Sequence, residues 1–443
     1  MDESNSFHKR LNRYLNVGLS ASGLAGQYAW GKAFKRSTHD QAFAEALYQF
    51  FGQLRGPMVK IAQLVAMIPD LLPPEYTEKL LKLQSQAPPM NKLFVRRRMR
   101  QELGLNWQDS FLSFDETAVS AASLGQVHKA THLNGQELAC KLQYPDMAAI
   151  VGADLEQLKL FFSLYQKWNP GLDHSNIFQE IKDHLLEELD YQKEAKNLSL
   201  FKTFFSQDSA VQIPSVHSAL STSKLLTMDW RSGRSLKNLS EKEDLNRIAK
   251  NLFHAWYTPF YKAGILHGDP HMGNYQVDKQ GTIILYDFGC VRVFEPSFIT
   301  SSILLYRALM TKNKEMECEA YKEWGFENLN QEIIDALHLW SSYLYGPLLE
   351  DRVRPIEESY SSLKGQKIAK EVARRLQSHG GVKPPKTFVF MDRAAIGLGS
   401  VFMHLKAHLN WHQLFESIID SVTQSSIAHQ QKTLGIGVQG SAL

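Results

Sequence analysis

Two carboxylates and one amide stand in a short part of this sequence, with spacing that suits phosphoryl transfer. Asp269 and Asn274 lie five residues apart, and Asp287 follows in the segment Leu-Tyr-Asp-Phe-Gly. Phosphoryl transfer needs a carboxylate beside the attacking group, and Mg²⁺ prefers hard oxygen ligands. The sequence therefore predicts that Asp269 orients the attacking group and that Asn274 and Asp287 hold Mg²⁺.

The residues around these three side chains indicate how they could converge. Residues 282–286 are typical of a strand, so Asp287 would project from its end, and Gly289 permits a sharp turn. Either motif alone could be an ordinary turn. Their order, their spacing and the hairpin predicted between them favour a functional site instead.

A lysine on a second predicted hairpin could bind phosphates. Asn134-Gly135 separates the predicted strands 119–129 and 136–143, and both residues accept positive φ. Lys141 lies in the second strand, from which it could reach the α- and β-phosphates of a nucleotide. A solvated strand lysine is the alternative. Its place after a hairpin and before both Asp motifs favours the phosphate role.

Lys141 would need a carboxylate partner from a nearby helix. Residues 185–198 look helical and contain Glu187, Glu188, Asp190 and Glu194. We select Glu194 as the partner that positions Lys141. A solvated acidic helix face is the alternative interpretation.

The bulk composition sets the class of protein. The chain has 443 residues, 44% hydrophobic and 21% charged, which is ordinary for a soluble globular protein. A net charge of +3 gives no argument for a nucleic-acid partner. The sparse cysteines fit a reducing compartment. Neither a secretory signal nor an apolar stretch of about 18 residues is recognisable, so a cytoplasmic location is expected.

The pattern along the chain predicts an α+β fold in three parts. Residues 1–112 read as a helical extension, 113–230 as a small mixed lobe with an inserted helix, and 231–443 as a larger, mostly helical lobe. Two lobes with a cleft between them are a natural nucleotide site. Further helices are expected over residues 147–168, 177–205 and 236–263, and further strands over residues 211–216 and 224–228.

The motifs together resemble the UbiB/AarF family of atypical kinase-like proteins. Residues 120–128 match the alanine-rich loop that this family has where protein kinases have a glycine-rich one. Residues 267–274 match the family's H-G-D-x-H-x-x-N loop, and Glu188-Leu189-Asp190 match its E-x-D element. The helix glutamate matches Glu194, and the K-x-G-Q element would be residues 60–63.

The resemblance implies a protein-kinase-like bilobal fold with ATP or ADP and Mg²⁺ as cofactors. In the family, the K-x-G-Q helix covers the cleft, so Lys60 would meet Glu188. A covered cleft suits a small molecule, a lipid or water as acceptor. Without the resemblance, Lys60 would be read as a surface charge. The implied nucleotide contacts are Ala121, Ala122, Ser123, Gly125, Gln126, Lys141, Lys60, Gln63, Glu188 and Asp190.

Two positions depart from the family pattern. Ala62 replaces the glycine of K-x-G-Q, and Ser120 replaces the first alanine of the loop. Ala121 and Ala122 carry Cβ atoms that restrict the backbone, unlike glycines, so the loop should grip phosphates differently and slow chemistry is expected.

The resemblance implies an ATPase or a small-molecule or lipid kinase that supports isoprenoid quinone (ubiquinone) biosynthesis and binds an isoprenoid or quinone precursor. A nucleotide-switched binding protein without turnover is the first alternative. A Ser/Thr protein kinase is the second, although H-G-D in place of H-R-D argues against it.

Three weaker signals remain. Leu11, Leu15 and Leu19, with basic neighbours, could form an amphipathic helix that contacts the inner face of a membrane. Arg96-Arg97-Arg98 more simply forms a solvated helix face. His404, His408 and His412 recur every four residues, but no acidic partner is near, so no metal site is predicted there.

Overall fold

The computed structural model describes residues 90–121, 124–168, 175–239, 244–358, 363–378 and 385–436. Two compact units divide the chain: the first contains the residues up to Lys193 together with His217–Trp230, and the second contains Glu194–Val216 and the residues from Arg231 onward. Several predicted features lie outside the described residues: Lys60, Gln63, Ala122, Ser123 and the amphipathic segment near the start of the chain.

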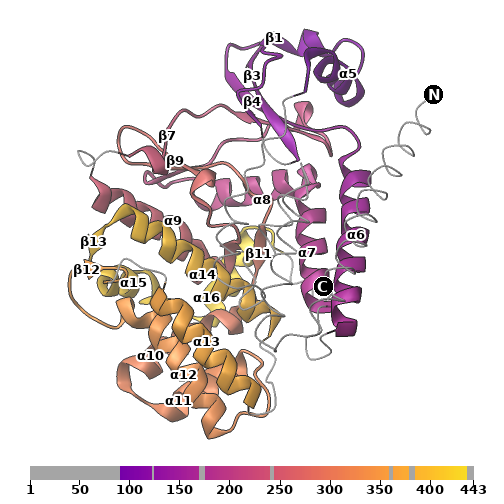
Figure 1. Ribbon diagram of the computed structural model, residues 1–443. Helices are drawn as coiled ribbons and strands as arrows, with labels where there is room; N and C mark the ends of the chain where they lie inside the picture. Colours follow the sequence, from indigo (N-terminus) through magenta and orange to yellow (C-terminus); the bar gives the residue numbers. More distant parts are fainter. Residues whose placement is uncertain are drawn as a thin grey trace. The chain divides into compact units, whose positions relative to one another are not determined.

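The first unit contains an antiparallel sheet (Figure 1). Its order is β1-β3-β4-β6, and a short strand, β2, pairs with β3. The predicted hairpin joins β3 and β4, and of its two turn residues only Gly135 adopts positive φ, at 87°. The strands are β1 (Phe111–Phe114), β2 (Ser120–Ala121), β3 (Gly125–His132), β4 (Glu137–Gln143) and β6 (Leu225–Asp229).

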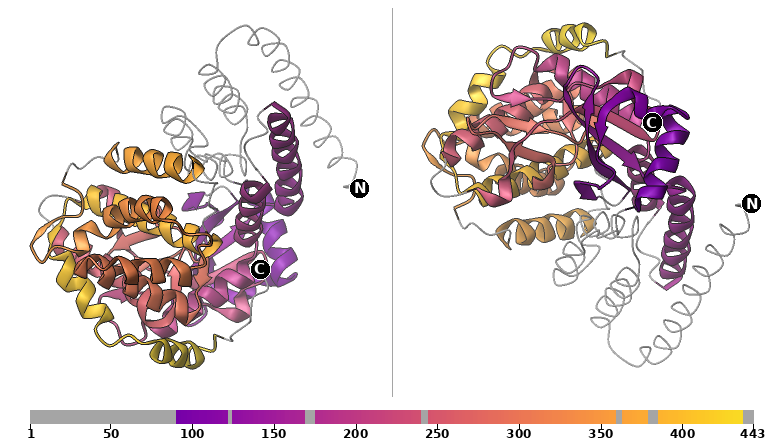
Figure 2. Two further views of the ribbon diagram at one scale, coloured as in Figure 1. Left: turned by 90° about the horizontal axis from the view of Figure 1, so that it is seen from below. Right: turned by 90° about the horizontal axis from the view of Figure 1, so that it is seen from above.

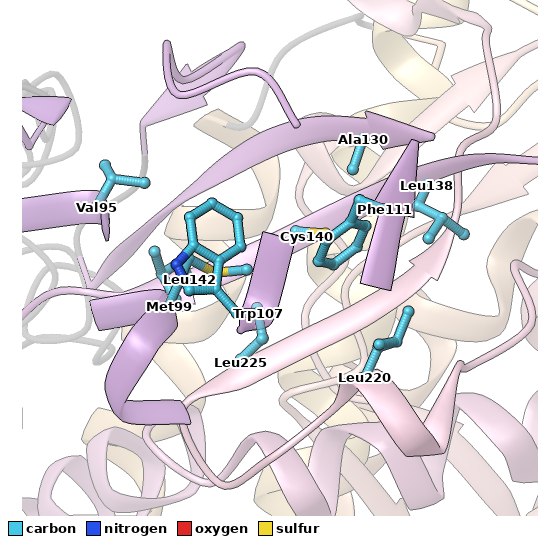
Figure 3. Close-up of a cluster of buried hydrophobic side chains, with 10 residues drawn as sticks. All are labelled: Val95, Met99, Trp107, Phe111, Ala130, Leu138, Cys140, Leu142, Leu220 and Leu225. Carbon is cyan, nitrogen blue, oxygen red and sulfur yellow. The ribbon is translucent and has the colours of Figure 1, made fainter. Parts of the chain in front are cut away.

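Helix α5 (Lys92–Leu103) packs on this sheet and completes its core. The Asn91 side chain caps the helix by accepting a hydrogen bond from the Phe94 N–H, and Gly104, at φ 90°, follows its end. Part of the predicted extension therefore packs within the first unit, while the three predicted domain ranges stay a prediction. Figure 3 shows the buried cluster, which contains Val95, Met99, Trp107, Phe111, Ala130, Leu138, Cys140, Leu142, Leu220 and Leu225.

Three helices follow the hairpin. Helix α6 (Met147–Trp168) has the predicted bounds, but the predicted helix 177–205 is two helices, α7 (Ser175–Glu188) and α8 (Tyr191–Phe204). The break has a local cause. Asp190 Oδ1 accepts hydrogen bonds from the N–H groups of Gln192 and Lys193, at 3.0 Å each, and so caps a new helix. The amide of Gln143 donates to the freed carbonyl of Leu189 at 3.1 Å.

The second unit contains short strands only. One sheet has the order β5-β10-β9-β7, and two pairs, β8 with β11 and β12 with β13, stand apart from it. The strand predicted over residues 211–216 is just two residues long, since Pro214 has no N–H to continue the ladder. The strands are β5 (Val211–Gln212), β7 (Arg234–Ser235), β8 (Ile265–His267), β9 (Tyr275–Val277), β10 (Ile283–Leu285), β11 (Val291–Val293), β12 (Arg354–Pro355) and β13 (His408–Leu409).

Helix α9 (Leu245–Ala263) is the central helix of the second unit. Asp244 caps its start and Gly264, in the left-handed conformation, ends it. It buries Phe253, Trp256 and Phe260. Helices α12 and α13 lie side by side, as Figure 2 shows in orange. The other helices are α10 (Pro296–Thr311), α11 (Lys314–Glu323), α12 (Gln331–Tyr345), α13 (Leu363–Ser378), α14 (Lys386–Leu405), α15 (Trp411–Ile419) and α16 (Gln424–Thr433).

Within the described ranges, no helix combines the length and the apolar character that a membrane span requires.

Candidate functional site

The loop that carries Asp269 begins at the end of β8 in the second unit. Strand β8 pairs with β11, and the backbone N–H of Gly268 donates to the carbonyl of Cys290 at 2.7 Å. A Cβ atom on Gly268 would lie only 2.5 Å from the Cys290 sulfur, so a larger residue would push the two segments apart. The glycine is therefore required by close approach, and this approach fixes where the loop starts.

Asn274 is bound directly to Asp269. It ends a short 3₁₀ turn (Met272–Asn274), and its side-chain nitrogen donates to the carbonyl of Asp269 at 3.1 Å and to the carboxylate at 3.0 Å. Because the nitrogen faces Asp269, the amide oxygen is the atom that remains for a cation. The structure thus brings together two of the predicted site residues.

Asp287 follows β10, as predicted, and neighbouring groups hold its backbone. The Gly289 N–H donates to the Asp287 carboxylate at 3.0 Å. The Nε2 of His267 is hydrogen-bonded to the Asp287 carbonyl. The amide of Asn197 donates to the Phe288 carbonyl at 2.9 Å. Since His267 belongs to β8, the loops of Asp269 and Asp287 are connected through one strand.

Aromatic rings pack around His267 and fix both loops. Its ring lies 5.3 Å from that of Trp256, 5.3 Å from that of Phe288 and 6.3 Å from that of Phe201, each edge to face. His267 is buried. Sequence reasoning missed the positioning roles of His267, Phe201 and Asn197. The histidine could have been found from its place before Gly-Asp, whereas nothing in the sequence separates Phe201 from any other core aromatic residue.

The charge of Asp269 acts on a buried tyrosine beside it. Burial and then the negative charge of Asp269 raise the pKa of Tyr275 well above its usual value, so this phenol stays neutral. Tyr275 is fully buried at the start of β9. It therefore forms an uncharged wall next to the carboxylate.

The donor set of these loops fits Mg²⁺. Among the described residues, no group of three or more His, Cys, Asp or Glu side chains is placed to hold a metal. Mg²⁺ is commonly bound through one or two carboxylates, with phosphates and water completing its shell. Asp287 and the amide oxygen of Asn274 are ligands of this kind, which would be completed by a nucleotide.

Lys141 is held at the centre of the sheet in the first unit. It pairs with Val127 of β3 on one side and Leu226 of β6 on the other. Its ammonium lies 5.2 Å from the centre of the Tyr191 ring, a distance typical of a cation–π contact. The side chain is half-buried, so it is no ordinary solvated lysine. Sequence reasoning did not identify Tyr191.

The described part of the alanine-rich loop is an exposed edge of the same sheet. Ser120 and Ala121 pair with Val127 and Gln126, and both are exposed. A Cβ atom on Gly125 would lie 2.6 Å from the Leu142 carbonyl oxygen and 2.7 Å from the Tyr191 hydroxyl. Glycine is needed at this position because another strand and a helix approach it closely.

The side chain of Gln126 is completely buried beneath that edge. Its amide oxygen accepts from the Met90 N–H at 2.7 Å, and its nitrogen donates to His128 Nε2 at 2.8 Å. His128 Nδ1 donates to the Asp115 carbonyl, and burial lowers the pKa of His128, so the ring is neutral. The predicted nucleotide contact of Gln126 would therefore have to come from its backbone.

The predicted acids lie at the junction of α7 and α8. Glu188 ends α7, with its carboxylate 3.3 Å from His184 Nδ1, and Asp190 caps α8. Glu194 is buried in the first turn of α8. Lys141 and Glu194 belong to different units, so their ion pair stays a prediction. His404, His408 and His412 lie in three separate elements, α14, β13 and α15, and so share no helix face.

Comparison with known proteins identifies the family of the chain. Residues 82–320 match the ABC1 atypical kinase-like domain. The fold and the paired loops thus define a kinase-like domain of α+β class, as predicted. The chain belongs to the ABC1 atypical kinase-like family, which the UbiB/AarF resemblance indicated.

Three relatives illustrate the similarity. The Arabidopsis thaliana chloroplastic protein ACTIVITY OF BC1 COMPLEX KINASE 8 is 30% identical over 66% of this chain and 40% of its own length. The Mus musculus AarF domain-containing protein kinase 1 is 30% identical over 62% of this chain and 54% of its own. The chain therefore spans about half the length of these relatives or less. The solved structure of the Rv3197–erythromycin complex from Mycobacterium tuberculosis is 25% identical, with a TM-score of 0.61, over 85% of this chain and 95% of that one.

Proposed function

We propose that this chain is a Mg²⁺-dependent phosphotransferase or ATPase that uses ATP. The hydrogen bond from Asn274 to Asp269 carries the proposal, because it sets a carboxylate and an amide oxygen side by side. His267 connects that pair to the backbone of Asp287. Membership of a kinase-like family supports nucleotide use.

The three side chains would have distinct roles. Asn274 and Asp287 would hold Mg²⁺, which neutralises the charge that develops on the phosphates. Asp269 would orient the acceptor or the attacking water, and the Asn274 amide would hold the carboxylate in place. The neutral phenol of Tyr275 would exclude water from the buried side of Asp269.

The first unit would supply the phosphate contacts. Lys141 would bind the α- and β-phosphates, with Tyr191 keeping its ammonium in position and Glu194 as its ionic partner. The exposed edge at Ala121 would approach the phosphates through its backbone. The proposal also retains eight further residues as nucleotide contacts: Ala122, Ser123, Gly125, Gln126, Lys60, Gln63, Glu188 and Asp190.

The acceptor would be water, a small molecule or a lipid, and we infer a role in supporting isoprenoid quinone (ubiquinone) biosynthesis. The UbiB/AarF resemblance of the loop motifs supports this role. Peripheral contact with a membrane through the segment near Leu11 belongs to the same proposal. Sedimentation with anionic liposomes, with and without residues 1–35, tests the contact, and equal binding of both proteins would reject it.

Replacing Asp287 with asparagine tests the metal assignment. Asparagine keeps an oxygen for the Gly289 N–H but loses the negative charge, so ATP turnover should fall by about 100-fold or more, since a metal contributes several kcal/mol to such reactions. Asp278→Asn is the matched control, because Asp278 also accepts backbone hydrogen bonds in a nearby turn. Unchanged turnover in Asp287→Asn removes the assignment. Nucleotide affinity without turnover in the unmodified protein would favour a nucleotide-switched binding protein.

A further inference from the structure

A cavity in the second unit has no role in the proposed chemistry. It has a volume of ≈ 70 Å³ and is lined by α9, β8, α12 and α14. One water needs only about 10–15 Å³ of such space, and an engineered cavity that binds benzene has about 150 Å³. This cavity lies between the two and is open on one side, so a small ring can enter it in part. Its walls are mostly aromatic and aliphatic, and they include Trp256, Phe260, Tyr345 and Leu398.

Besides the Trp256 indole N–H, which is fully buried and has no partner among the described residues, the walls carry the hydroxyl groups of three tyrosines. The Tyr345 hydroxyl donates to the Ser302 carbonyl at 3.3 Å, and Tyr261 shares hydrogen bonds with Ser302 and Tyr345. The Tyr257 hydroxyl, in contrast, has no hydrogen-bond partner among the described residues. Burial raises the pKa of Tyr257, so its phenol remains a neutral donor.

These features select a ligand class. Water needs two to four polar partners to be held in a cavity, and beyond the buried Trp256 N–H this one offers a single free hydroxyl. Flat aromatic walls favour a ring, which can stack or meet them edge to face. We propose that the cavity binds a small apolar molecule with one ring and one hydrogen-bond acceptor, which accepts from the Tyr257 hydroxyl.

The cavity also touches both supports of the loop at Asp269. Leu266, one of its walls, directly precedes His267 in β8. Helix α14 provides Ala394 and Ala395 to the cavity, and Gly397 on the same helix packs against Pro270, where a Cβ atom would lie 2.4 Å from the proline ring. A bound ligand therefore contacts the strand and the helix that hold this loop, and should slow its opening.

Two probes of similar shape test the proposal. Ethylbenzene has a ring and no acceptor, whereas acetophenone has a carbonyl acceptor on the same ring. Saturation-transfer NMR on the full chain should show both binding, with acetophenone roughly two- to tenfold tighter, as expected for one hydrogen bond. Tyr257→Phe should remove this preference and leave ethylbenzene unchanged. A preference that survives in Tyr257→Phe overturns the assignment of the hydroxyl.

Filling the cavity gives an independent test. Ala395→Leu should abolish the binding of both probes, whereas Ser400→Leu adds the same side chain at an exposed position of α14 and should not. Circular dichroism shows whether each variant folds. Binding to folded Ala395→Leu with unchanged affinity, or no binding to the unmodified protein, overturns the site.

Deuterium exchange measures the effect on the loop. Acetophenone should slow exchange in peptides that cover residues 265–270 in the unmodified protein and not in Ala395→Leu. This readout needs neither nucleotide nor turnover, so its failure and the failure of the proposed function are separate results. Protection confined to other regions overturns the coupling to the loop.

Discussion

The two units hold their functional residues in different ways. In the second unit, the groups that are held are mostly backbone groups: the His267 side chain binds the carbonyl of Asp287, and the N–H of Gly268 donates to the carbonyl of Cys290. In the first unit, a regular sheet fixes Lys141 between two strands, and a buried side-chain amide, that of Gln126, ties strand β3 to Met90. The second site therefore depends on the path of its loops, whereas the first depends on particular side chains.

The largest effect should come from changing the loop path of the second unit. In Gly268→Ala the new Cβ would meet the Cys290 sulfur at 2.5 Å, so the loop must shift. A displacement near 1 Å can cost about 100-fold in rate, and overpacking costs about 1–3 kcal/mol of stability. ATP turnover and the denaturation midpoint measure the two effects. The double variant Gly268→Ala, Cys290→Ala should recover much of both, and a neutral Gly268→Ala would contradict the comparison.

A buried carboxyl gives the second unit a pH dependence. Burial raises the pKa of Asp392 from 3.8 to about 7, although the Trp340 indole N–H donates to this carboxylate at 2.7 Å. The folded state then binds this proton more tightly than the unfolded state, so stability falls as pH rises from about 4 to about 7, by a few kcal/mol at most. Urea denaturation at pH 5 and pH 8 should show a smaller fall for Asp392→Asn than for the unmodified protein.

Asp335→Asn is the control for this measurement, because Asp335 is more exposed and should leave the pH dependence intact. Equal pH profiles for Asp392→Asn and the unmodified protein would show that Asp392 is not buried as described.

The first unit should respond in the opposite direction. Burial lowers the pKa of His128, so the contribution of this residue to stability is lost as pH falls below about 6.5.

In the first unit, the sensitive change is in a side chain. Gln126→Leu would leave the Met90 N–H and one nitrogen of His128 without their partner. Unsatisfied buried groups cost about 1–3 kcal/mol, which should appear as a lower urea midpoint. Gln108→Leu, at an exposed position of the same unit, serves as the control. A midpoint that does not move in Gln126→Leu would mean that this amide does not hold the sheet.

The smallest effect should follow the loss of one phosphate contact. Lys141→Met keeps the length and the packing of the side chain but removes its charge, so nucleotide affinity should weaken by about tenfold, or about 1.4 kcal/mol, while stability changes little. Isothermal titration with ATP and Mg²⁺ measures the affinity. Lys129→Met, which removes a lysine that is paired with Glu137 in the same sheet, should have no effect on it. Equal affinity for both variants would leave Lys141 without a role in binding.

Local patterns in the sequence were enough to predict much of the fold and the proximity of Asp269 and Asn274. The five-residue spacing of Asp269 and Asn274 is realised as a direct hydrogen bond, and helix α6 has its predicted bounds. The predicted helix 177–205 was wrong in one respect, the break before Asp190, although an aspartate at that point is a recognisable cap.

The remaining features depend on contacts between distant parts of the chain. Phe201 becomes a positioning residue only because its ring packs against the ring of His267. The buried side chain of Gln126 is satisfied only because the distant Met90 N–H donates to it. Tyr191 supports Lys141 across a helix and a strand that are separated by some 50 positions. No periodicity or propensity records such pairings, since they arise from tertiary packing.

The buried thiols have a practical consequence. Cys140 lies in the core of the first unit, where burial raises its pKa to about 12, and Cys290 is buried in the second. Alkylating reagents attack the thiolate, so both sulfurs are shielded while their surroundings stay closed. Each unit thus contains its own natural reporter, and pulse-labelling followed by peptide mass spectrometry can time the opening of the two halves independently, without any engineered dye.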